Sequence, residues 1–97
     1  MAHFMLLHVG FEQPTPEIMT KWNEWFESVA DKAVTHGGFM HGRRLTDEGI
    51  EALEMGLDSM TGYSIINAEN IDEAVTIAQG NPFITSIQIY EIRQLGG

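Results

Sequence analysis

The chain has 97 residues, 43% of them hydrophobic, and 14 acidic residues against 5 basic ones give it a formal net charge of −9. This length fits a single domain over residues 1–97, and the lack of cysteine excludes disulfides, thiolate nucleophiles and cysteine-ligated zinc. No Lys or Arg lies between Arg44 and Arg93, so we expect neither nucleic acid nor a membrane as a partner.

A short apolar run at residues 3–9, closed by Gly10, predicts a first strand. No basic flank precedes the run and Glu12 soon follows, so it resembles neither a signal peptide nor a membrane span. We therefore expect a cytoplasmic protein, whose acidity serves solubility rather than an acidic docking face.

A long helix is predicted over residues 17–35. Thr15 suits its N-cap, Pro16 its first position and Glu17 the positive end of its dipole, while Gly37 and Gly38 are expected to end it. An apolar stripe at steps of three and four contains Ile18, Trp22, Trp25 or Phe26, Val29 and Ala33. Because Trp22 and Trp25 cannot share the centre of this stripe, one of them is expected to edge toward a groove or a dimer contact.

The middle of the chain has weaker signals. Residues 39–45 predict a second strand with Phe39, His41 and Arg43 on one face. Residues 46–49, "TDEG", predict a turn. Residues 50–60 are expected to form an irregular connection, because Gly49 and Gly56 bracket too few residues for a stable helix.

The last third carries the clearest pattern. Residues 63–67 predict a strand; Asn70 and Glu73 then stand at the spacing of a capping box, at the start of a helix of about ten residues. Gly80 is expected to end that helix in the left-handed conformation before Pro82, and residues 84–92 predict a final strand.

Together these elements predict an α+β fold, a ferredoxin-like βαββαβ antiparallel sheet with both helices on one face. Phe4 and Leu6 lie on one side of the first strand and Met5 and Leu7 on the other, so the uncovered face is apolar too. Burying it calls for a second copy, and we predict a homodimer, the dimeric α+β barrel. Only Gly96 and Gly97 are expected to fray.

Three stretches, "FMLLHVG", "GRRLTDEG" and "GYSIINAENIDEAVTIAQGNP", together with a final strand ending in "YEI", resemble the YCII-related family of dimeric α+β barrel proteins, which includes the DGPF proteins. The resemblance covers nearly the whole chain, and the block at residues 62–82 is its most specific part. It implies the same fold and dimer, with a cleft between the sheet and the long helix that binds small molecules.

The chain departs from this family at the residues that would carry chemistry. The namesake Asp-Gly-Pro-Phe motif and the family's hairpin are expected to be missing, with Asp58 only a distant candidate for the acid. Family members taken as enzymes have a His–Asp pair with the His on the first helix. The predicted helix has no His, so no catalytic residue is carried over.

The four histidines are the side chains that titrate near neutral pH. We expect His3 near the terminus to be exposed and His36 to lie at a helix C-terminus, where an imidazolium suits the dipole. His8 and His41 fall within predicted strands, where either simple hydrogen bonding or proton transfer is open to them. Their spacing predicts no metal site, and we expect no cofactor.

Three further side chains are candidates for a ligand pocket. Trp22 is either core or a pocket wall, Arg43 either an ion-pair partner or an anchor for a carboxylate, and Tyr63 either packing or a hydroxyl that orients a substrate. The predicted ligand-binding set is His8, Trp22, His41, Arg43 and Tyr63.

Three functions remain open at this stage. The first is a homodimer that binds a small apolar or weakly acidic molecule between sheet and helices. The second is a cofactor-free enzyme of the same architecture, monooxygenase-like or isomerase- or lyase-like, with His8 or His41 taking a proton. The third is a structural or regulatory partner without a ligand.

Overall fold

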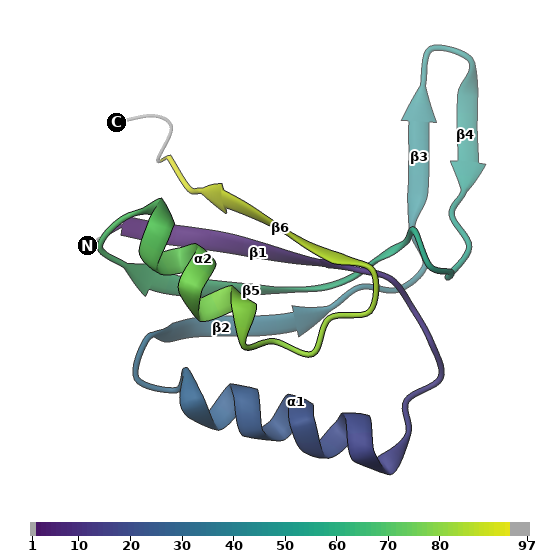
Figure 1. Cartoon of the computed structure of the whole chain (residues 1–97). Helices are drawn as coiled ribbons and strands as arrows, with labels where there is room; N and C mark the ends of the chain where they lie inside the picture. The colour runs from purple at the N-terminus through teal and green to yellow at the C-terminus, as the bar shows by residue number, and fades with distance from the viewer. Residues whose placement is uncertain (1, 94–97) are drawn as a thin grey trace.

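The computed structural model describes residues 2–93, which form an α+β fold with a projecting hairpin (Figure 1). In chain order its elements are β1 (Ala2–Val9), α1 (Pro16–Ser28), β2 (Ala33–Gly38), β3 (Arg43–Thr46), β4 (Gly49–Ala52), β5 (Met60–Ala68), α2 (Ile71–Gln79) and β6 (Ser86–Glu91). Neither helix of this part of the chain is long and apolar enough to cross a membrane. The expectation that Gly96 and Gly97 fray falls outside the described residues.

Four strands form an antiparallel sheet in the order β2-β5-β1-β6, which is the ferredoxin-like arrangement expected from the sequence. The two central strands, β1 and β5, pair along almost their whole length, from Ala2 opposite Ala68 to His8 opposite Gly62. The strands of the first βαβ unit, β1 and β2, therefore lie on either side of β5. The strands of the second unit, β5 and β6, lie on either side of β1.

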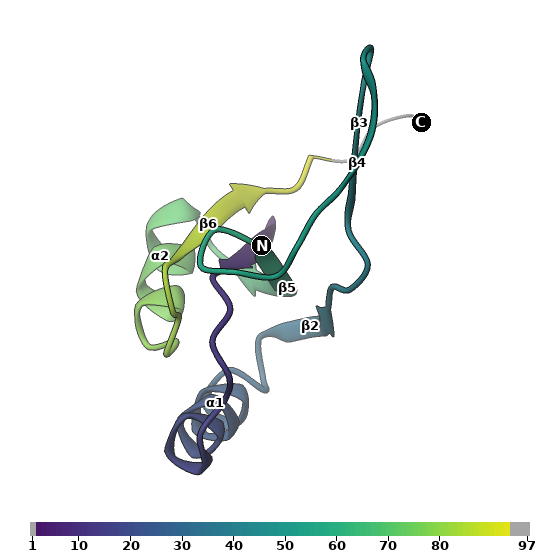
Figure 2. The ribbon, with the colours of Figure 1, turned by 90° about the vertical axis from the view of Figure 1, so that its right-hand side faces the viewer.

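Both helices cover one face of the sheet, as expected (Figure 2). Phe4, Leu6 and Ile66 are fully buried on this face, because residues paired across antiparallel strands share a side and Phe4 lies opposite Ile66. Trp25 of α1 and Ala74 of α2 complete this core. The helix-covered face is therefore the dry interior of the domain.

The opposite face of the sheet is also apolar. Met5 and Leu7 alternate with the buried residues of β1. Met5 lies opposite Ile65 of β5 on one side and opposite Tyr90 of β6 on the other. Tyr90 is 57% exposed. This surface, called here the open face, has no helix over it.

Helix α1 begins as expected, with the Thr15 hydroxyl accepting from the Ile18 amide at 3.2 Å. The prediction that it runs to Thr35 is wrong: the helix ends at Ser28, and β2 starts at Ala33. The β-branched residues Val34 and Thr35 suit a strand, and β2 satisfies the free edge of β5, which a longer helix would leave unpaired.

The strand predicted at residues 39–45 starts too early: its last three residues belong to a strand, β3, which lies outside the four-stranded sheet. Residues 39–42 form a link in which His41 has a positive φ of 57°, and the next strand is β3. The turn at residues 46–49 is confirmed. Because β4 follows it and pairs with β3, the expectation of a missing hairpin is wrong. The irregular connection expected over residues 50–60 is confined to residues 53–59. Gly49 supplies the φ of 134° that lets two short strands meet so tightly.

The β3–β4 hairpin stands away from the sheet, on the side opposite the helices (Figures 1 and 2). Among the elements of residues 2–93 it packs against neither helix and against no strand of the four-stranded sheet. The radius of gyration, 14.7 Å, accordingly exceeds the roughly 12.5 Å expected of a compact chain of this length. Leu45 and Ile50, paired across the hairpin, are 76% and 74% exposed.

Helix α2 follows its sequence signals closely at its start. The Asn70 side chain accepts from the Glu73 amide at 2.9 Å, as predicted, while the Glu73 carboxylate pairs with Lys32 at 3.3 Å. The prediction for Gly80 is wrong: its φ is −80°, so the helix ends without a left-handed residue. The final strand lies within its predicted range.

Candidate functional site

A cleft of about 380 Å³ opens between α1 and the adjacent strands of the sheet. Its walls come from one helix and three strands, which meet here because β5 lies between β1 and β2. The lining residues are His8, Trp22, Phe26, His36, Gly37, Gly38, Thr61, Gly62, Tyr63 and Ser64. The cleft therefore lies on the helix-covered face, where the sequence resemblance implies a binding site.

A hydrogen-bonded chain of three polar side chains crosses the cleft. Nδ1 of His36 lies 2.8 Å from the Ser64 hydroxyl oxygen, and Nε2 of His8 lies 3.2 Å from the same atom. The register explains the arrangement: Ser64 of β5 lies opposite Leu6 of β1 and opposite His36 of β2, so its side chain stands between the two neighbouring strands. Ser64 is fully buried and His8 is only 6% exposed.

The two imidazoles are neutral at pH 7. Burial, and secondly the nearby His36 ring, lower the pKa of His8 from 6.5 to about 4. Burial also lowers the pKa of His36. The ten lining residues, all in the described part of the chain, include no Lys, Arg, Asp or Glu that would oppose these shifts or hold a charged ligand.

Aromatic rings enclose the histidines from the helix side. His8 meets Trp22 edge to face with ring centroids 5.0 Å apart, and His36 meets Phe26 in the same way at 4.6 Å. Trp22 and Phe26 contact each other at 5.7 Å. The cleft thus combines apolar ring surfaces with a few polar atoms, as small-molecule sites commonly do.

Glycines leave the strand side of the cleft as bare backbone. A Cβ on Gly62 would lie 2.8 Å from the Gly37 carbonyl oxygen, and a Cβ on Gly37 would collide with the Tyr63 ring. The close approach of β5 to β2 therefore depends on the missing side chain at Gly62, while Gly37 leaves room for the Tyr63 ring.

The predicted ligand-binding residues separate into two groups. The cleft brings together His8, Trp22 and Tyr63, although the Tyr63 ring lies across Gly37 and stacks on Phe39 at 5.5 Å, toward the open face. His41 and Arg43 are not among its lining residues: His41 belongs to the link before β3, and Arg43 begins the hairpin and donates to the Gly42 carbonyl at 2.9 Å. The expectation that one Trp edges toward a groove is confirmed by Trp22, since Trp25 is 3% exposed.

Arg44, the neighbour of Arg43, forms an ion pair, with its guanidinium 2.6 Å from the Glu51 carboxylate across the exposed hairpin. Among residues 2–93, no group of three or more His, Asp or Glu side chains is placed to hold a metal ion.

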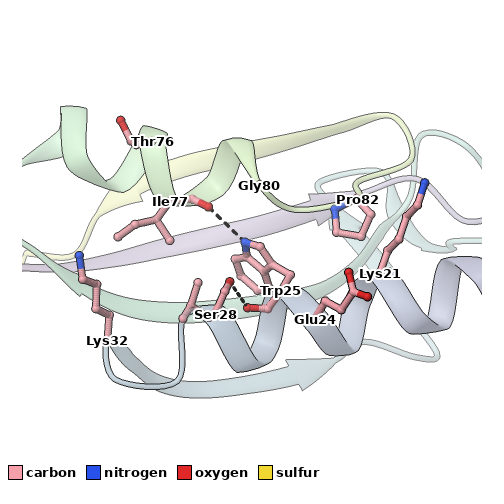
Figure 3. Close-up of a pocket in the computed structure, with 10 residues that line it drawn as sticks. Lys21, Glu24, Trp25, Ser28, Lys32, Thr76, Ile77, Gly80 and Pro82 are labelled. Carbon is pink, nitrogen blue, oxygen red and sulfur yellow. Dashed lines mark hydrogen bonds between the residues drawn. The ribbon is translucent and has the colours of Figure 1, made fainter.

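A second hollow, of about 530 Å³, runs between the two helices (Figure 3). Its main polar groups already have partners: the Trp25 indole donates to the Ile77 carbonyl at 3.1 Å, and the Ser28 hydroxyl donates to the Trp25 carbonyl at 2.7 Å. Lys21 and Lys32 lie toward opposite ends of it. The first of these bonds joins α1 to α2 and the second lies within α1. The groove lacks the converging polar atoms of the histidine cleft.

No protein-family model matches the sequence, and no curated protein sequence matches it. A solved structure with the same fold is 5-chloro-2-hydroxyhydroquinone dehydrochlorinase (TftG) from Burkholderia phenoliruptrix AC1100, in complex with 2,5-dihydroxybenzoquinone. The two superpose with a TM-score of 0.55 over 98% of this chain and 95% of that chain, at 14% sequence identity. The likeness shows the fold. It thereby supports the α+β barrel architecture that the sequence resemblance implies.

Two central residues of the cleft, His36 and Ser64, were not predicted. His36 was expected at a helix C-terminus and instead lies on β2, facing the helix. Its signal was present in "AVTHGG", where two β-branched residues and two glycines favour a strand edge rather than a helix end. Ser64 had no signal of its own, because its importance comes only from the strands on either side.

Proposed function

We propose that this protein binds a small, planar, largely apolar molecule in the cleft between α1 and the sheet, as a homodimer of the YCII-like type. The residues that line the site include His8, Trp22, Phe26, His36 and Ser64. The dimer partner is a second copy of the chain, joined through the open face.

The single observation that carries the proposal is the series of hydrogen bonds from His36 through Ser64 to His8, with aromatic rings packed against both histidines. A fully buried hydroxyl between two neutral imidazoles is costly to assemble for stability alone, since one ring nitrogen of His8 has no hydrogen-bond partner in the described part of the chain. Polar groups of this kind at the base of an apolar cleft are typical of ligand sites.

The fold neighbour supports the choice of ligand class. TftG has the same fold and was solved with 2,5-dihydroxybenzoquinone, a flat six-membered ring. A flat ring suits a cleft with Trp22 and Phe26 on one side and bare glycine backbone on the other. We expect the same class of molecule, rather than the same compound, to bind here.

The homodimer is proposed from the open face. Met5, Leu7, Ile65 and Tyr90 form an apolar surface on a sheet whose other side is already covered. A single sheet with apolar residues on both faces is stable in water only when a second layer covers the face that the helices leave exposed. A second copy offers the matching surface.

The proposal is tested by titrating the protein with a panel of small aromatic, quinonoid and carboxylic compounds while following Trp fluorescence and melting temperature. Trp22 lines the cleft, so a bound ring is expected to change its emission and raise the melting temperature together. Trp22→Phe should keep the thermal shift and lose most of the fluorescence change. A panel that moves neither signal would contradict binding and favour a partner protein without a ligand.

A cofactor-free enzyme, isomerase- or lyase-like or monooxygenase-like, is the second candidate. The observation that favours it is that His36 is neutral and reaches the cleft, so it can exchange a proton with a bound ring. Turnover of hydroxylated or chlorinated rings, followed by absorbance, separates the two functions: an enzyme loses turnover in His36→Gln while ring binding persists.

A further inference from the structure

One atom in the cleft decides which protons its histidines carry. Nδ1 of His8 is buried and has no hydrogen-bond partner within residues 2–93. A neutral imidazole has one N–H and one bare nitrogen, so this buried atom is either an N–H donor or a lone pair. Orphaned buried N–H groups are rarer in proteins than acceptors left unfilled, so we assign Nδ1 of His8 as the nitrogen without a proton.

This assignment fixes the next two hydrogen bonds. With Nδ1 bare, His8 carries its proton on Nε2 and donates to the Ser64 oxygen at 3.2 Å. The hydroxyl of Ser64 has no acceptor other than His36 among residues 2–93, so its single proton goes to Nδ1 of His36 at 2.8 Å. His36 therefore accepts at Nδ1 and carries its own proton on Nε2.

Nε2 of His36 is the end of this hydrogen-bonded series that remains available to a ligand. No described residue hydrogen-bonds to it, and His36 is the more exposed of the two histidines. Because both imidazoles are neutral at pH 7, this end offers a hydrogen-bond donor without a positive charge. A neutral imidazole can stabilise negative charge that develops on a carbonyl oxygen.

We infer that the cleft selects a neutral, carbonyl-bearing ring, such as a quinone or cyclic ketone, whose oxygen accepts a hydrogen bond from Nε2 of His36. This inference rests on the proposed function and adds to it the class of ligand and the atom that recognises it. Ser64 and His8 are positioning residues, since they act only through the tautomer of His36. The absence of Lys and Arg from the lining excludes carboxylates from the preferred ligands.

The tautomers are measurable without any ligand. Long-range nitrogen–proton correlation spectra of ¹⁵N-labelled protein at pH 7 distinguish the protonated from the bare ring nitrogen of each histidine. We expect Nε2–H on both His8 and His36. In Ser64→Ala, His36 should become a mixture of tautomers while His8 stays neutral. An Nδ1–H tautomer on His36 in the unaltered protein would overturn the inference.

The ligand preference is tested with four rings of similar size: 2,3-dimethyl-1,4-naphthoquinone, 2,3-dimethylnaphthalene, 1-naphthol and 1-naphthoate. We expect the quinone to bind about tenfold more tightly than the hydrocarbon, the effect of one added hydrogen bond. His36→Leu should remove that advantage, His36→Gln, which keeps an amide donor, should retain part of it, and His41→Gln, outside the cleft, should leave it unchanged.

The outcomes separate this inference from the proposed function. If none of the four rings binds, the proposed function fails and the ligand class fails with it. If 1-naphthol or 1-naphthoate binds more tightly than the quinone, or if His36→Leu keeps the full preference while its melting curve shows a folded protein, the cleft binds rings but the inference is wrong.

Discussion

His8 and His36 reach the same hydroxyl, that of Ser64, from two strands that do not pair with each other. The strand that separates them, β5, supplies the shared group from its buried face. Protonating both rings would leave Ser64 with donors on two sides and would bring two positive charges together in an apolar site. Both rings are therefore neutral near pH 7, and burial is the largest cause of the lowered pKa of each.

The first prediction concerns stability in mild acid. Because the pKa of His8 is lowered from 6.5 to about 4, the unfolded chain binds a proton between these pH values that the folded chain does not. The free energy of unfolding should therefore fall as the pH falls through this window, by about 3 kcal/mol from His8 at most. Urea unfolding between pH 7 and pH 4 measures it.

The matched control for this prediction is His8→Phe, which keeps a ring against Trp22 but cannot titrate. Carboxylates elsewhere contribute equally to both proteins in this range, so only the difference between the two curves counts. Parallel curves for the two proteins from pH 6.5 to pH 4 would contradict the lowered pKa of His8.

The second prediction concerns the buried hydroxyl. Ser64→Ala removes the hydrogen bond to Nε2 of His8, after which neither ring nitrogen of this buried residue has a partner among residues 2–93. We expect a loss of about 1–3 kcal/mol in the free energy of unfolding, although the change in side-chain volume is small. Ser86→Ala on β6, whose side chain faces the open side of the sheet, should change it by no more than about 0.5 kcal/mol. Equal effects at the two serines would refute the role given to Ser64.

The parts of the fold that were predicted are those with local signals. The start of α2 follows from the side chain of Asn70, which bonds an amide three residues away. The two faces of β1 follow from alternation within seven residues, of which Phe4 and Leu6 proved to be the fully buried set. The fold class followed because the order of elements restricts how such units can connect.

The site was predicted only in part because it depends on pairing between distant segments. The apolar stripe of α1 continues in register to Ala33, so helical periodicity alone does not show that the helix ends at Ser28. The helix ends at Ser28 because the following residues pair with β5 as strand β2. This pairing involves a distant segment, so the periodicity of residues 17–35 does not show it. Because the helix was predicted to run to residue 35, β2 was predicted too late in the sequence, and His36 was not included among the candidate site residues.

The third prediction concerns the contact between the helices. The Trp25 ring is buried, and its indole N–H donates to the carbonyl of Ile77, which lies in the last turn of α2 (Figure 3). Trp25→Phe should lower the free energy of unfolding by about 1–3 kcal/mol, from the lost hydrogen bond and the small cavity. Trp22→Phe, at a half-buried position on the cleft, should cost less. A larger loss from Trp22 than from Trp25 would contradict the assignment of core and cleft.

The fourth prediction tests the open face as the dimer surface. A stable interface buries about 800 Å² on each partner, so the apolar side of a four-stranded sheet is a suitable size. Leu7→Asp places a charge at the centre of that face without touching the helix-covered core, since Leu7 alternates with the buried Leu6 and His8. We expect light scattering at micromolar concentration to show a dimer for the unaltered protein and a monomer for Leu7→Asp.

Ile50→Asp is the matched control for this change. It adds the same charge at a more exposed apolar position, but on the hairpin, which packs against no part of the described sheet. The dimer should therefore persist in Ile50→Asp. A monomer for the unaltered protein would refute the homodimer. Loss of the dimer in Ile50→Asp but not in Leu7→Asp would instead place the contact between copies on the hairpin, and the open face would then need a different cover.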